Sequence, residues 1–376
     1  MTELASIIAG RIGREGPIPF AEFMEMALYY PGLGYYTRPE AEIGSKGDFY
    51  TSPHLHPAFG ALMGRQVREC WELMGRPAEF RVVEPGGGRG WLARDLLDHL
   101  KGSDVYDAMQ YLLVELNPRM KERQAGLLEA HGGKVAWARG LGELEPSAGV
   151  ILSNELIDAM PVHVVEVTEQ GLREVYVAME DGKFAEVLME PGAPGIGRYM
   201  ERYAPGLPVG YRTEVNLALG QWLGSASRAL AEGYILTVDY GHPAMEYFNA
   251  DRSRGTLLCY HGHRADEDFY EHVGGRDLTA HVNFSAMKDW GAELGLTALG
   301  YCRQGVYLVS MGLDEVVVAM YGETPGMGRE LQKIQGLIMP GTMGDTHKVL
   351  LQHKGGNPPE LKALRGFGMK NEVGKL

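Results

Sequence analysis

The chain has few cysteines, no long apolar run and a deficit of basic residues. Its 376 residues include three cysteines, which lie far apart at Cys70, Cys259 and Cys302. This spacing forms neither a CxxC motif nor a disulfide framework, which indicates a reducing compartment. No apolar stretch approaches the roughly 20 residues that span a bilayer, and the first residues are not those of a signal peptide. We therefore expect a cytoplasmic protein without a membrane span.

The charge balance argues against a nucleic-acid partner. The chain has 36 Lys and Arg residues against 49 Asp and Glu residues, a net charge of −13. Nucleic-acid binding needs a basic face, so we expect none here. The short histidine pairs His54-Leu55-His56 and His261-Gly262-His263 have no cysteine partner and lie in no HExxH helix. We therefore also expect no metal site.

Strand-like and helix-like segments alternate from residue 80 onward. Phe80–Glu84 is a short apolar strand, Trp91–Leu100 has leucines on one helical face, and Tyr111–Val114 is the next strand. Further strands are predicted at 135–138, 149–153, 234–239 and 348–352. This alternation predicts an α/β fold with a parallel, Rossmann-like sheet covered by helices on both faces.

The length suggests one large domain with insertions, or two domains. Two amphipathic helices open the chain, and the Asp181-Gly182 turn lies between two strand-like segments. Gly355-Gly356 and Pro358-Pro359 near the end are typical of a mobile tail. The predicted segments are an N-terminal helical region at 1–75, a core at 76–161 and 211–352, an inserted β-meander and loop at 162–210, and a mobile tail at 353–376.

A glycine-rich turn follows the first strand of the core. It reads Glu84-Pro85-Gly86-Gly87-Gly88-Arg89-Gly90 and opens a helix. Glycines at Gly86, Gly88 and Gly90 let the backbone pass close to a ligand. A dinucleotide fold would place its third glycine at position 91, which is Trp91. The spacing favours S-adenosylmethionine over NAD, and the alternative is a turn without a ligand.

Glu115 ends the second strand of the core. A carboxylate at this place can accept two hydrogen bonds from ribose hydroxyls. NAD enzymes use the same arrangement, so Glu115 indicates a nucleoside without identifying the cofactor. The alternative is a negative charge at the start of the helix that Asn117-Pro118 begins.

Further acidic residues follow the fourth and fifth strands, at the rim where open α/β sheets bind ligands. Asn154, Glu155 and Asp158 follow the fourth strand. Glu155 and Asp158 would share one face of a helical turn and, beside a cationic cofactor, favour a cationic acceptor. The alternative is a helix cap at Asn154 and a solvated Asp158. Asp239 ends the fifth strand, where it is either structural or orients the acceptor.

Several motifs together resemble one known family. They are GDFYTSP at 47–53, EPGGGRG at 84–90, Glu115, SNELIDAMPV at 153–162, VDYG at 238–241, GTLLCYHGH at 255–263 and DLTAHVNF at 277–284. The chain resembles the MidA-like methyltransferases, a group that includes a mitochondrial complex I assembly factor that methylates a protein arginine. The resemblance implies a class I S-adenosylmethionine methyltransferase fold, mostly parallel with an antiparallel final strand, plus an N-terminal helical region.

The resemblance also implies a cofactor, a reaction and roles for residues. S-adenosylmethionine would bind at the glycine turn, Glu84 and Glu115. The N-terminal region would act as a lid, in which Asp48, Thr51 and Ser52 cover the cofactor. Glu155 and Asp158, with Asn154 and Asp239, would bind and deprotonate an arginine of a protein partner, such as a respiratory-complex subunit. The alternatives are a small-molecule O- or N-methyltransferase and a non-catalytic assembly or binding protein.

The chain departs from the family at a few positions. It has Pro85 and Gly87 where the family usually has Leu and Pro, which leaves the three spaced glycines intact. It has His54 where the family usually has Glu, and Asn283 where it usually has Asp. The last two changes concern the acceptor more than the cofactor.

Overall fold

A computed structural model of the chain describes residues 1–38, 51–261, 264–322, 327–356, 358–360 and 363–376. Its contacts divide the chain into two compact units. Unit 1 comprises Met1–Phe49, Ile157–Gln221 and His242–Ala286, and unit 2 comprises Tyr50–Leu156, Trp222–Gly241 and Met287–Leu376. The division into segments that the sequence suggests stays a prediction, apart from the tail.

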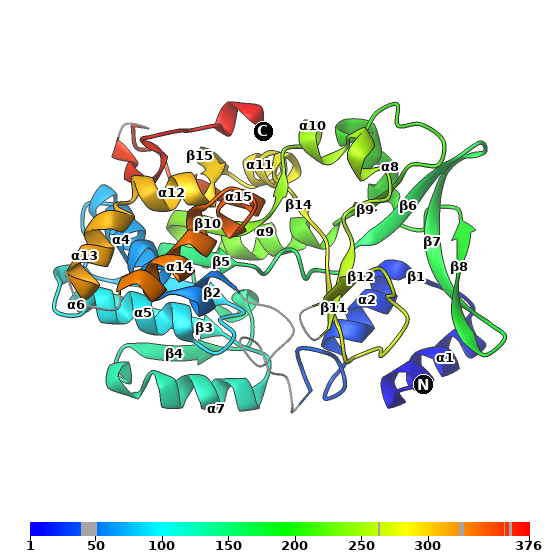
Figure 1. The fold of residues 1–376 in the computed structure, drawn as a ribbon, viewed down its shortest axis with the longest axis horizontal. Helices are drawn as coiled ribbons and strands as arrows, with labels where there is room; N and C mark the ends of the chain where they lie inside the picture. Colours follow the sequence, from blue (N-terminus) through cyan, green and yellow to red (C-terminus); the bar gives the residue numbers. More distant parts are fainter. Residues whose placement is uncertain (39–50, 262–263, 323–326, 357, 361–362) are drawn as a thin grey trace. The chain divides into compact units, whose positions relative to one another are not determined.

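Unit 2 is built around a mixed sheet with the strand order β15-β16-β10-β5-β2-β3-β4 (Figure 1). The strands are β2 (Phe80–Pro85), β3 (Met109–Val114), β4 (Val135–Ala138), β5 (Ser147–Asn154), β10 (Leu230–His242), β15 (Leu296–Arg303) and β16 (His347–Lys354). From β10 to β4 the neighbours pair in parallel, whereas β16 pairs antiparallel with both β10 and β15. The predicted fold class, with its antiparallel final strand, is confirmed.

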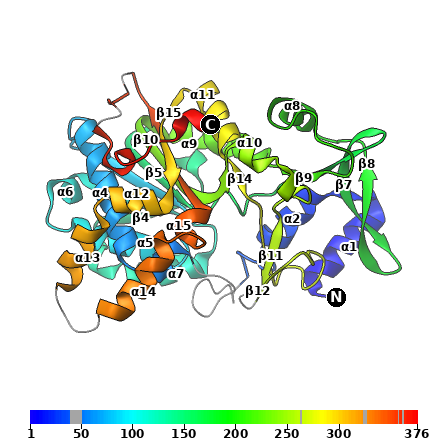
Figure 2. The same cartoon turned by 45° about the horizontal axis from the view of Figure 1, so that its top comes forward.

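Both faces of this sheet are covered, because successive residues of its central strands are buried. Val150 and Ile151 of β5 point to opposite faces, and both are fully buried. On one face, Val150 packs with residues of α4 (Ala58–Leu73) and α5 (Trp91–Leu100). On the other face, Gln352 of β16 donates to the Met287 carbonyl of α11 (Phe284–Glu293). Figure 2 shows the same sheet from a second direction.

The remaining helices of unit 2 connect and flank these strands. They are α3 (Ser52–Leu55), α6 (Asp104–Ala108), α7 (Pro118–Leu127), α12 (Gln304–Ser310), α13 (Leu313–Tyr321), α14 (Met327–Ile338) and α15 (Met343–Thr346), and α9 (Ala218–Ala229) continues from unit 1. Helices α12 and α13 were not predicted. They lie in a short segment where buried residues such as Tyr307 and Val316 pack against the core of α4 and α5.

Unit 1 contains two small antiparallel sheets beside two N-terminal helices. One sheet has the order β1-β7-β6-β9 with β8 paired to β7, and the other has the order β12-β11-β13. The elements are α1 (Glu3–Glu15), β1 (Ile18–Pro19), α2 (Phe20–Tyr29), β6 (His163–Thr168), β7 (Gly171–Glu180), β8 (Lys183–Met189), α8 (Pro194–Tyr203), β9 (Arg212–Val215), α10 (Ala244–Tyr247), β11 (Leu258–His261), β12 (Arg264–Asp266), β13 (Asp277–Thr279) and β14 (Val282–Asn283). The predicted helical region and β-meander are therefore present.

The segment after the meander differs from the prediction of a continuous loop. Helix α8 forms there, begins at Pro194 and buries Ile196, Tyr199 and Tyr203 on one face. This spacing is that of an amphipathic helix, and the Pro and Gly residues around it obscured the pattern. Arg212–Val215 then forms strand β9, which completes the sheet beside β6.

The described residues of the C-terminal tail are packed, contrary to the prediction of a mobile segment. Leu364 is fully buried and Phe367 is 4% exposed, within the same apolar core as α4 and α5. Beyond them, the Tyr301 amide donates to Asn371 Oδ1, and the Glu372 amide donates to the Tyr301 carbonyl. These apolar contacts and hydrogen bonds together anchor the described part of the segment.

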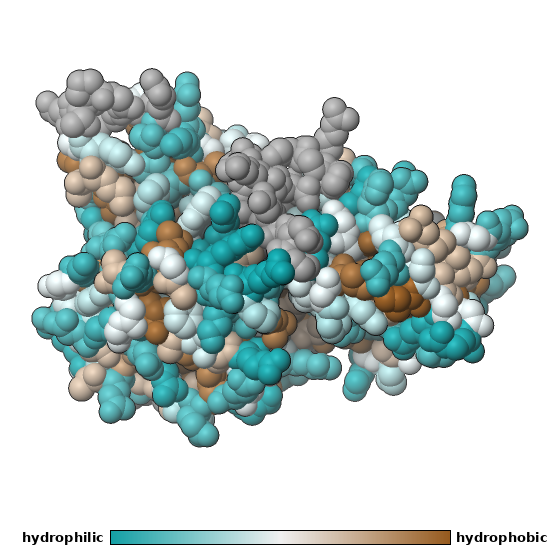
Figure 3. Space-filling view, turned by 90° about the horizontal axis from the view of Figure 1, so that it is seen from below, coloured by the Kyte–Doolittle hydropathy of each residue, from teal (hydrophilic) through white to brown (hydrophobic). Residues whose placement is uncertain are grey.

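Among the described residues, no helix combines the length and the apolar character that crossing a membrane requires. On the face drawn in Figure 3, hydrophilic residues predominate and hydrophobic ones form small patches.

Candidate functional site

The turn between β2 and α5 has a backbone that only glycine adopts easily. Gly86, Gly88 and Gly90 have φ angles of 68°, 51° and 85°. The Gly86 amide donates to the Val114 carbonyl at 3.0 Å, which ties the turn to β3. The turn therefore presents bare backbone at the carboxyl end of β2, as the binding of a nucleoside cofactor at this place requires.

Gln124 of α7 joins the glycine turn to Glu115. Its Nε2 donates to the Gly88 carbonyl at 2.7 Å and to Glu115 Oε2 at 3.0 Å. Its Oε1 accepts from Trp137 Nε1 at 2.9 Å, and the residue is fully buried. Gln124 was not predicted as a site residue, because a glutamine on a polar helix gives no local signal of these contacts.

Two carboxylates lie at this end of the sheet in settings that disfavour their charge. Glu84 is 4% exposed, and Tyr111 donates to its Oε2 at 2.6 Å. Burial, with a smaller effect of the Glu115 charge, raises the pKa of Glu84 from 4.5 to about 7. Burial also raises the pKa of Glu115, although the Asn117 amide donates to it at 2.8 Å. A ligand bearing hydroxyl or ammonium donors would stabilise the ionised forms.

Glu155 lies directly after β5 and is held by the segment that begins at Thr51. Its side chain is 3% exposed. Its Oε1 accepts from the Ser52 amide at 3.0 Å and from Asn154 Nδ2 at 3.3 Å. Leu156 follows, and a Cβ at Gly86 would lie 2.9 Å from its Cδ1, so this segment borders the glycine turn. Three residues predicted for the site are thus brought together: Ser52, Asn154 and Glu155.

Asp239 supports the backbone after β5. It is fully buried in β10. Its Oδ2 accepts from the Leu156 amide at 3.2 Å and its Oδ1 from the Tyr240 amide at 2.8 Å. These contacts place Asp239 where it orients the Glu155 segment.

The residues that lead into α3 lie beside the start of α5. Thr51 Oγ1 contacts His54 Nδ1, and the His54 ring stands edge-on to the Trp91 ring, with centroids 4.1 Å apart. Ser52 is fully buried, and its hydroxyl donates to Gln304 Oε1 at 3.0 Å. Asp48, which was predicted to cover the cofactor, lies outside the described residues.

Asp158 is not on a helical turn with Glu155, which corrects that part of the prediction. Strand β5 runs to Asn154, and Glu155 takes a φ of 46°, so no helix begins there. Asp158 belongs to unit 1, where its charge and that of Asp277 act on Tyr36. Burial, followed by these charges, raises the pKa of the Tyr36 phenol, which donates to Asp277 Oδ1 at 2.8 Å.

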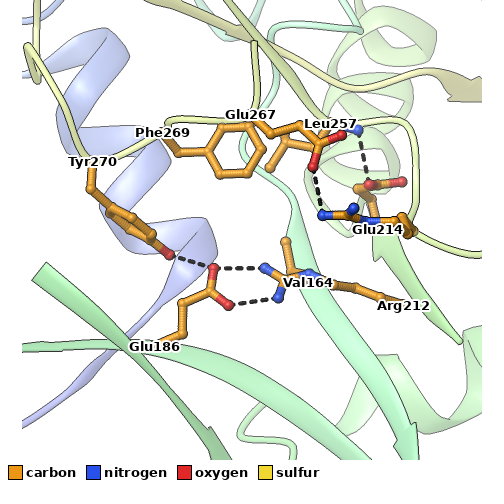
Figure 4. A pocket seen from close by; sticks show the side chains of 9 residues that line it. Val164, Glu186, Arg212, Glu214, Leu257, Glu267, Phe269 and Tyr270 are labelled. Carbon is orange, nitrogen blue, oxygen red and sulfur yellow. Dashed lines mark hydrogen bonds and ion pairs between the residues drawn. The ribbon is translucent and has the colours of Figure 1, made fainter. Parts of the chain in front are cut away.

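Unit 1 also contains a pocket of about 230 Å³ (Figure 4). Arg212 forms a bidentate pair with Glu186 at 2.6 and 2.7 Å, and Tyr270 donates to the same carboxylate at 2.8 Å. Arg254 and Glu267 pair at 2.8 Å, and both are exposed. The pocket is lined by Val164, Glu186, Arg212, Glu214, Arg254, Leu257, Glu267, Phe269 and Tyr270. Because these charged groups are mostly each other's partners, the pocket is a weaker candidate than the strand ends of unit 2.

Among the residues that the structure describes, no group of three His, Cys, Asp or Glu side chains is arranged to hold a metal ion. His263, from one of the histidine pairs of the sequence, lies outside the described residues. The three cysteines are free and buried.

Comparisons with known proteins identify the family of the chain. Residues 62–302 match the family described as "Putative S-adenosyl-L-methionine-dependent methyltransferase". Protein arginine methyltransferase NDUFAF7, mitochondrial, of Danio rerio is 30% identical over 90% of this chain and 84% of its own length. The Homo sapiens protein of that name is 30% identical over 92% of this chain and 82% of its own length.

Two crystal structures of proteins from Burkholderia thailandensis are also similar over most of their length. One is described as a "likely methyl transferase" bound to S-adenosyl-homocysteine; it is 30% identical with a TM-score of 0.86, covering 99% of this chain and 96% of that chain. The other, a native structure of an uncharacterized protein, is 31% identical with a TM-score of 0.87 and the same coverage.

The names of the relatives correct one expectation from the sequence. They describe mitochondrial proteins, which contradicts the predicted cytoplasmic location. That prediction rested on the low cysteine content and the first residues of the chain, and neither feature distinguishes one reducing compartment from another.

Proposed function

Because this chain belongs to the family of S-adenosyl-L-methionine-dependent methyltransferases, we propose that it methylates an arginine of a protein partner. Membership of this family confirms the predicted resemblance, enzyme class and cofactor. The curated relatives named as protein arginine methyltransferases support the choice of acceptor. The observation that carries the proposal is Glu155, a carboxylate buried at the carboxyl end of β5 and bordering the glycine turn.

The cofactor would be held at the carboxyl ends of β2 and β3. Gly86, Gly88 and Gly90 would let its nucleoside approach the backbone, and Glu115, fixed by Gln124, would accept from the ribose hydroxyls. Bound S-adenosylmethionine supplies an electrophilic methyl group on a sulfonium. Glu84 would add negative charge near that cation. Thr51, Ser52 and Asp48 stay predicted cover residues for the cofactor.

The acceptor would be bound by the Glu155 segment. The remaining carboxylate oxygen of Glu155 would accept a charge-assisted hydrogen bond from a guanidinium N–H and so aim one nitrogen at the methyl group. An arginine is always protonated, so a base must take a proton as the new N–C bond forms. Glu155 would take that proton, with Asn154 and Asp239 fixing its position. Asp158 stays a predicted second carboxylate.

Two alternatives predict different acceptors. A small-molecule O- or N-methyltransferase would share the cofactor residues, but its acceptor would not require the Glu155 charge. A non-catalytic assembly or binding protein would bind the cofactor without turnover. We further propose that the protein partner is a subunit of a respiratory complex, in line with the family that the sequence resembles.

The proposal is tested with the full chain, methyl-labelled S-adenosylmethionine and a mitochondrial lysate. Mass spectrometry should find the label on arginine in protein. In single-turnover reactions, Glu155→Gln should lower the transfer rate by about 10²–10⁴-fold, the range for a lost general base. Affinity for S-adenosylhomocysteine should change less than about twofold, because the glycine turn and Glu115 remain.

The exposed Glu145, in the segment before β5, gives a matched control, and Glu145→Gln should leave both quantities unchanged. Label found only on small molecules would replace the arginine acceptor by the first alternative. Cofactor binding with no labelled product at all would favour the second.

A further inference from the structure

His347 lies beside Glu155, at the start of the antiparallel strand. Strands β5, β10 and β16 are neighbours, and Tyr240 of β10 is the register partner of His347. The Glu155 amide donates to the Val238 carbonyl of β10 at 2.9 Å. Because β16 runs against β10, its first residue reaches the edge of the sheet where the parallel strands end. The topology therefore brings a histidine to the proposed acceptor site.

The imidazole of His347 is buried and lies near the Thr346 hydroxyl, the Tyr240 ring and the Glu155 carboxylate. Its side chain is 0% exposed, its Nδ1 lies 3.1 Å from Thr346 Oγ1, and the Tyr240 ring lies 3.9 Å away between centroids. Its Nε2 lies 3.5 Å from Glu155 Oε1. Among the described residues, no group forms a hydrogen bond of regular geometry with this Nε2. A buried nitrogen without a hydrogen bond destabilises the folded protein, so its presence here needs a physical reason.

Two tautomers fit the contact with Thr346, because its hydroxyl also lies 3.2 Å from the Thr342 carbonyl and can donate there while accepting from an Nδ1–H. That tautomer would leave a bare Nε2 lone pair facing the Glu155 carboxylate, which is unfavourable, so we favour the other one. If the Thr346 hydroxyl donates to Nδ1, the proton of the neutral ring is on Nε2, which then points its N–H at Glu155 Oε1. The separation of 3.5 Å is long, as catalytic hydrogen bonds often are before the substrate binds. Within the described part of the chain, the Ser52 amide and Asn154 also donate to Oε1, whereas no hydrogen bond reaches Oε2.

We propose that His347 is a positioning residue for Glu155, an inference that rests on the proposed function. Its Nε2–H holds Oε1 and keeps Oε2 available for the guanidinium. In the transfer, a guanidinium nitrogen forms a bond to the methyl carbon, and the electron pair of the broken S–C bond stays on sulfur. The proton displaced from that nitrogen passes to Glu155 Oε2. His347 keeps its own proton throughout.

His353 provides a matched control on the same strand. It is 3% exposed, faces the same side of β16 as His347, and lies against Tyr234 of β10 with ring centroids 5.0 Å apart. The carboxylate whose charge acts on it is Glu232, near the start of β10 and away from the strand end where Glu155 lies. Its replacement therefore measures the cost of losing a buried histidine from β16 without touching Glu155.

The kinetic test compares His347→Ala, His347→Gln and His353→Gln. His347→Ala should lower kcat for arginine methylation by about 10–100-fold, with affinity for S-adenosylhomocysteine within about twofold of wild type. His347→Gln should recover most of the activity, because its amide nitrogen can replace the Nε2 donor. His353→Gln should leave kcat unchanged. Equal kcat for the Ala and Gln variants of His347, or an equal loss in His353→Gln, would overturn the proposal.

A spectroscopic test does not depend on the acceptor. In protein labelled with ¹⁵N-histidine, the signals of His347 should show the proton on Nε2, and Glu155→Gln should shift the Nε2 signal more than the Nδ1 signal. A proton on Nδ1, or an Nε2 signal indifferent to Glu155→Gln, would refute the pairing. If wild-type protein methylates no arginine, the proposed function is wrong, and this measurement still decides whether His347 holds Glu155.

Discussion

Tyr111 and Glu84 share a buried hydrogen bond between the neighbouring strands β2 and β3, in which the phenol donates to Oε2 at 2.6 Å. Both groups are enclosed by the sheet and its covering helices, and burial raises the pKa of each. The bond satisfies one oxygen of a carboxylate that has little water around it. Glu84 is therefore held close to the balance between its neutral and ionised forms.

The raised pKa of Glu84 makes the free energy of unfolding depend on pH. The pKa of Glu84 rises from 4.5 to about 7 on folding, because burial disfavours its charge. Its stabilising contribution is therefore complete below about pH 4.5 and is lost as the pH rises through 7. Glu84→Gln should remove this loss, so that the variant gains up to about 3 kcal/mol on wild type between pH 5 and pH 8. Urea unfolding at both pH values measures the gain.

Glu79, exposed just before β2, serves as the control for that experiment. Glu79→Gln should change stability equally at the two pH values. A Glu84→Gln variant that follows the wild-type pH dependence would show that Glu84 stays ionised in the folded protein.

Replacement of Gln124 should weaken cofactor binding, although no sequence pattern indicated its role. Gln124→Leu keeps a side chain of similar size but removes the donor that Glu115 and Gly88 share. Loss of about 1–2 kcal/mol of hydrogen bonding should weaken S-adenosylhomocysteine binding about 5–30-fold by calorimetry. Gln110→Leu, at an exposed position of β3, should leave the affinity unchanged. Equal affinities of the two variants would show that Gln124 does not contribute to cofactor binding.

Alanine variants at Gly90 and Gly102 distinguish the effect of backbone strain from an effect on cofactor binding. Gly90 and Gly102 have φ angles of 85° and 79°, and alanine is strained at both by about 1–2 kcal/mol. A Cβ at Gly102 meets nothing within 4 Å, whereas one at Gly90 lies 3.4 Å from Gln124 Cγ. Both alanine variants should lose similar stability in thermal unfolding, but only Gly90→Ala should lose S-adenosylhomocysteine affinity. A similar loss of affinity in Gly102→Ala would make the effect one of general destabilisation.

The pocket of unit 1 contains a strong and a weak ion pair. Burial alone would raise the pKa of Glu186, but the hydrogen bonds and charge of Arg212 lower it overall. Arg212→Leu should therefore cost about 1–3 kcal/mol at pH 7.5, and the cost should shrink as the pH falls below 4.5 through the lowered pKa of Glu186. Arg254→Leu breaks an exposed pair and should cost under about 0.5 kcal/mol. Equal shifts in urea midpoint would show that Arg212 contributes no more than a surface charge.

The parts of the site that are formed by residues adjacent in the sequence could be predicted. The strand, the glycine turn and the helix after it are contiguous, so their spacing alone indicated a nucleoside site at Gly86–Gly90. Glu155 and Asp158 were paired on the assumption of a helical turn, which β5 prevents by extending to Asn154. Gln124 and His347 act through residues distant in the chain, and no local pattern reveals such contacts.

The antiparallel β16 also has a consequence for how the protein is made. Its first residue, His347, lies 29 positions before the last residue of the sequence, yet it contacts the carboxylate that follows β5. During synthesis, β2, β3 and β5 leave the ribosome long before β16, so β10 first has an open edge where β16 later pairs. A chain that stops before β16 lacks part of the surroundings of Glu155. A truncated product would thus lack both the histidine beside the proposed acceptor site and part of the core that packs against α4 and α5.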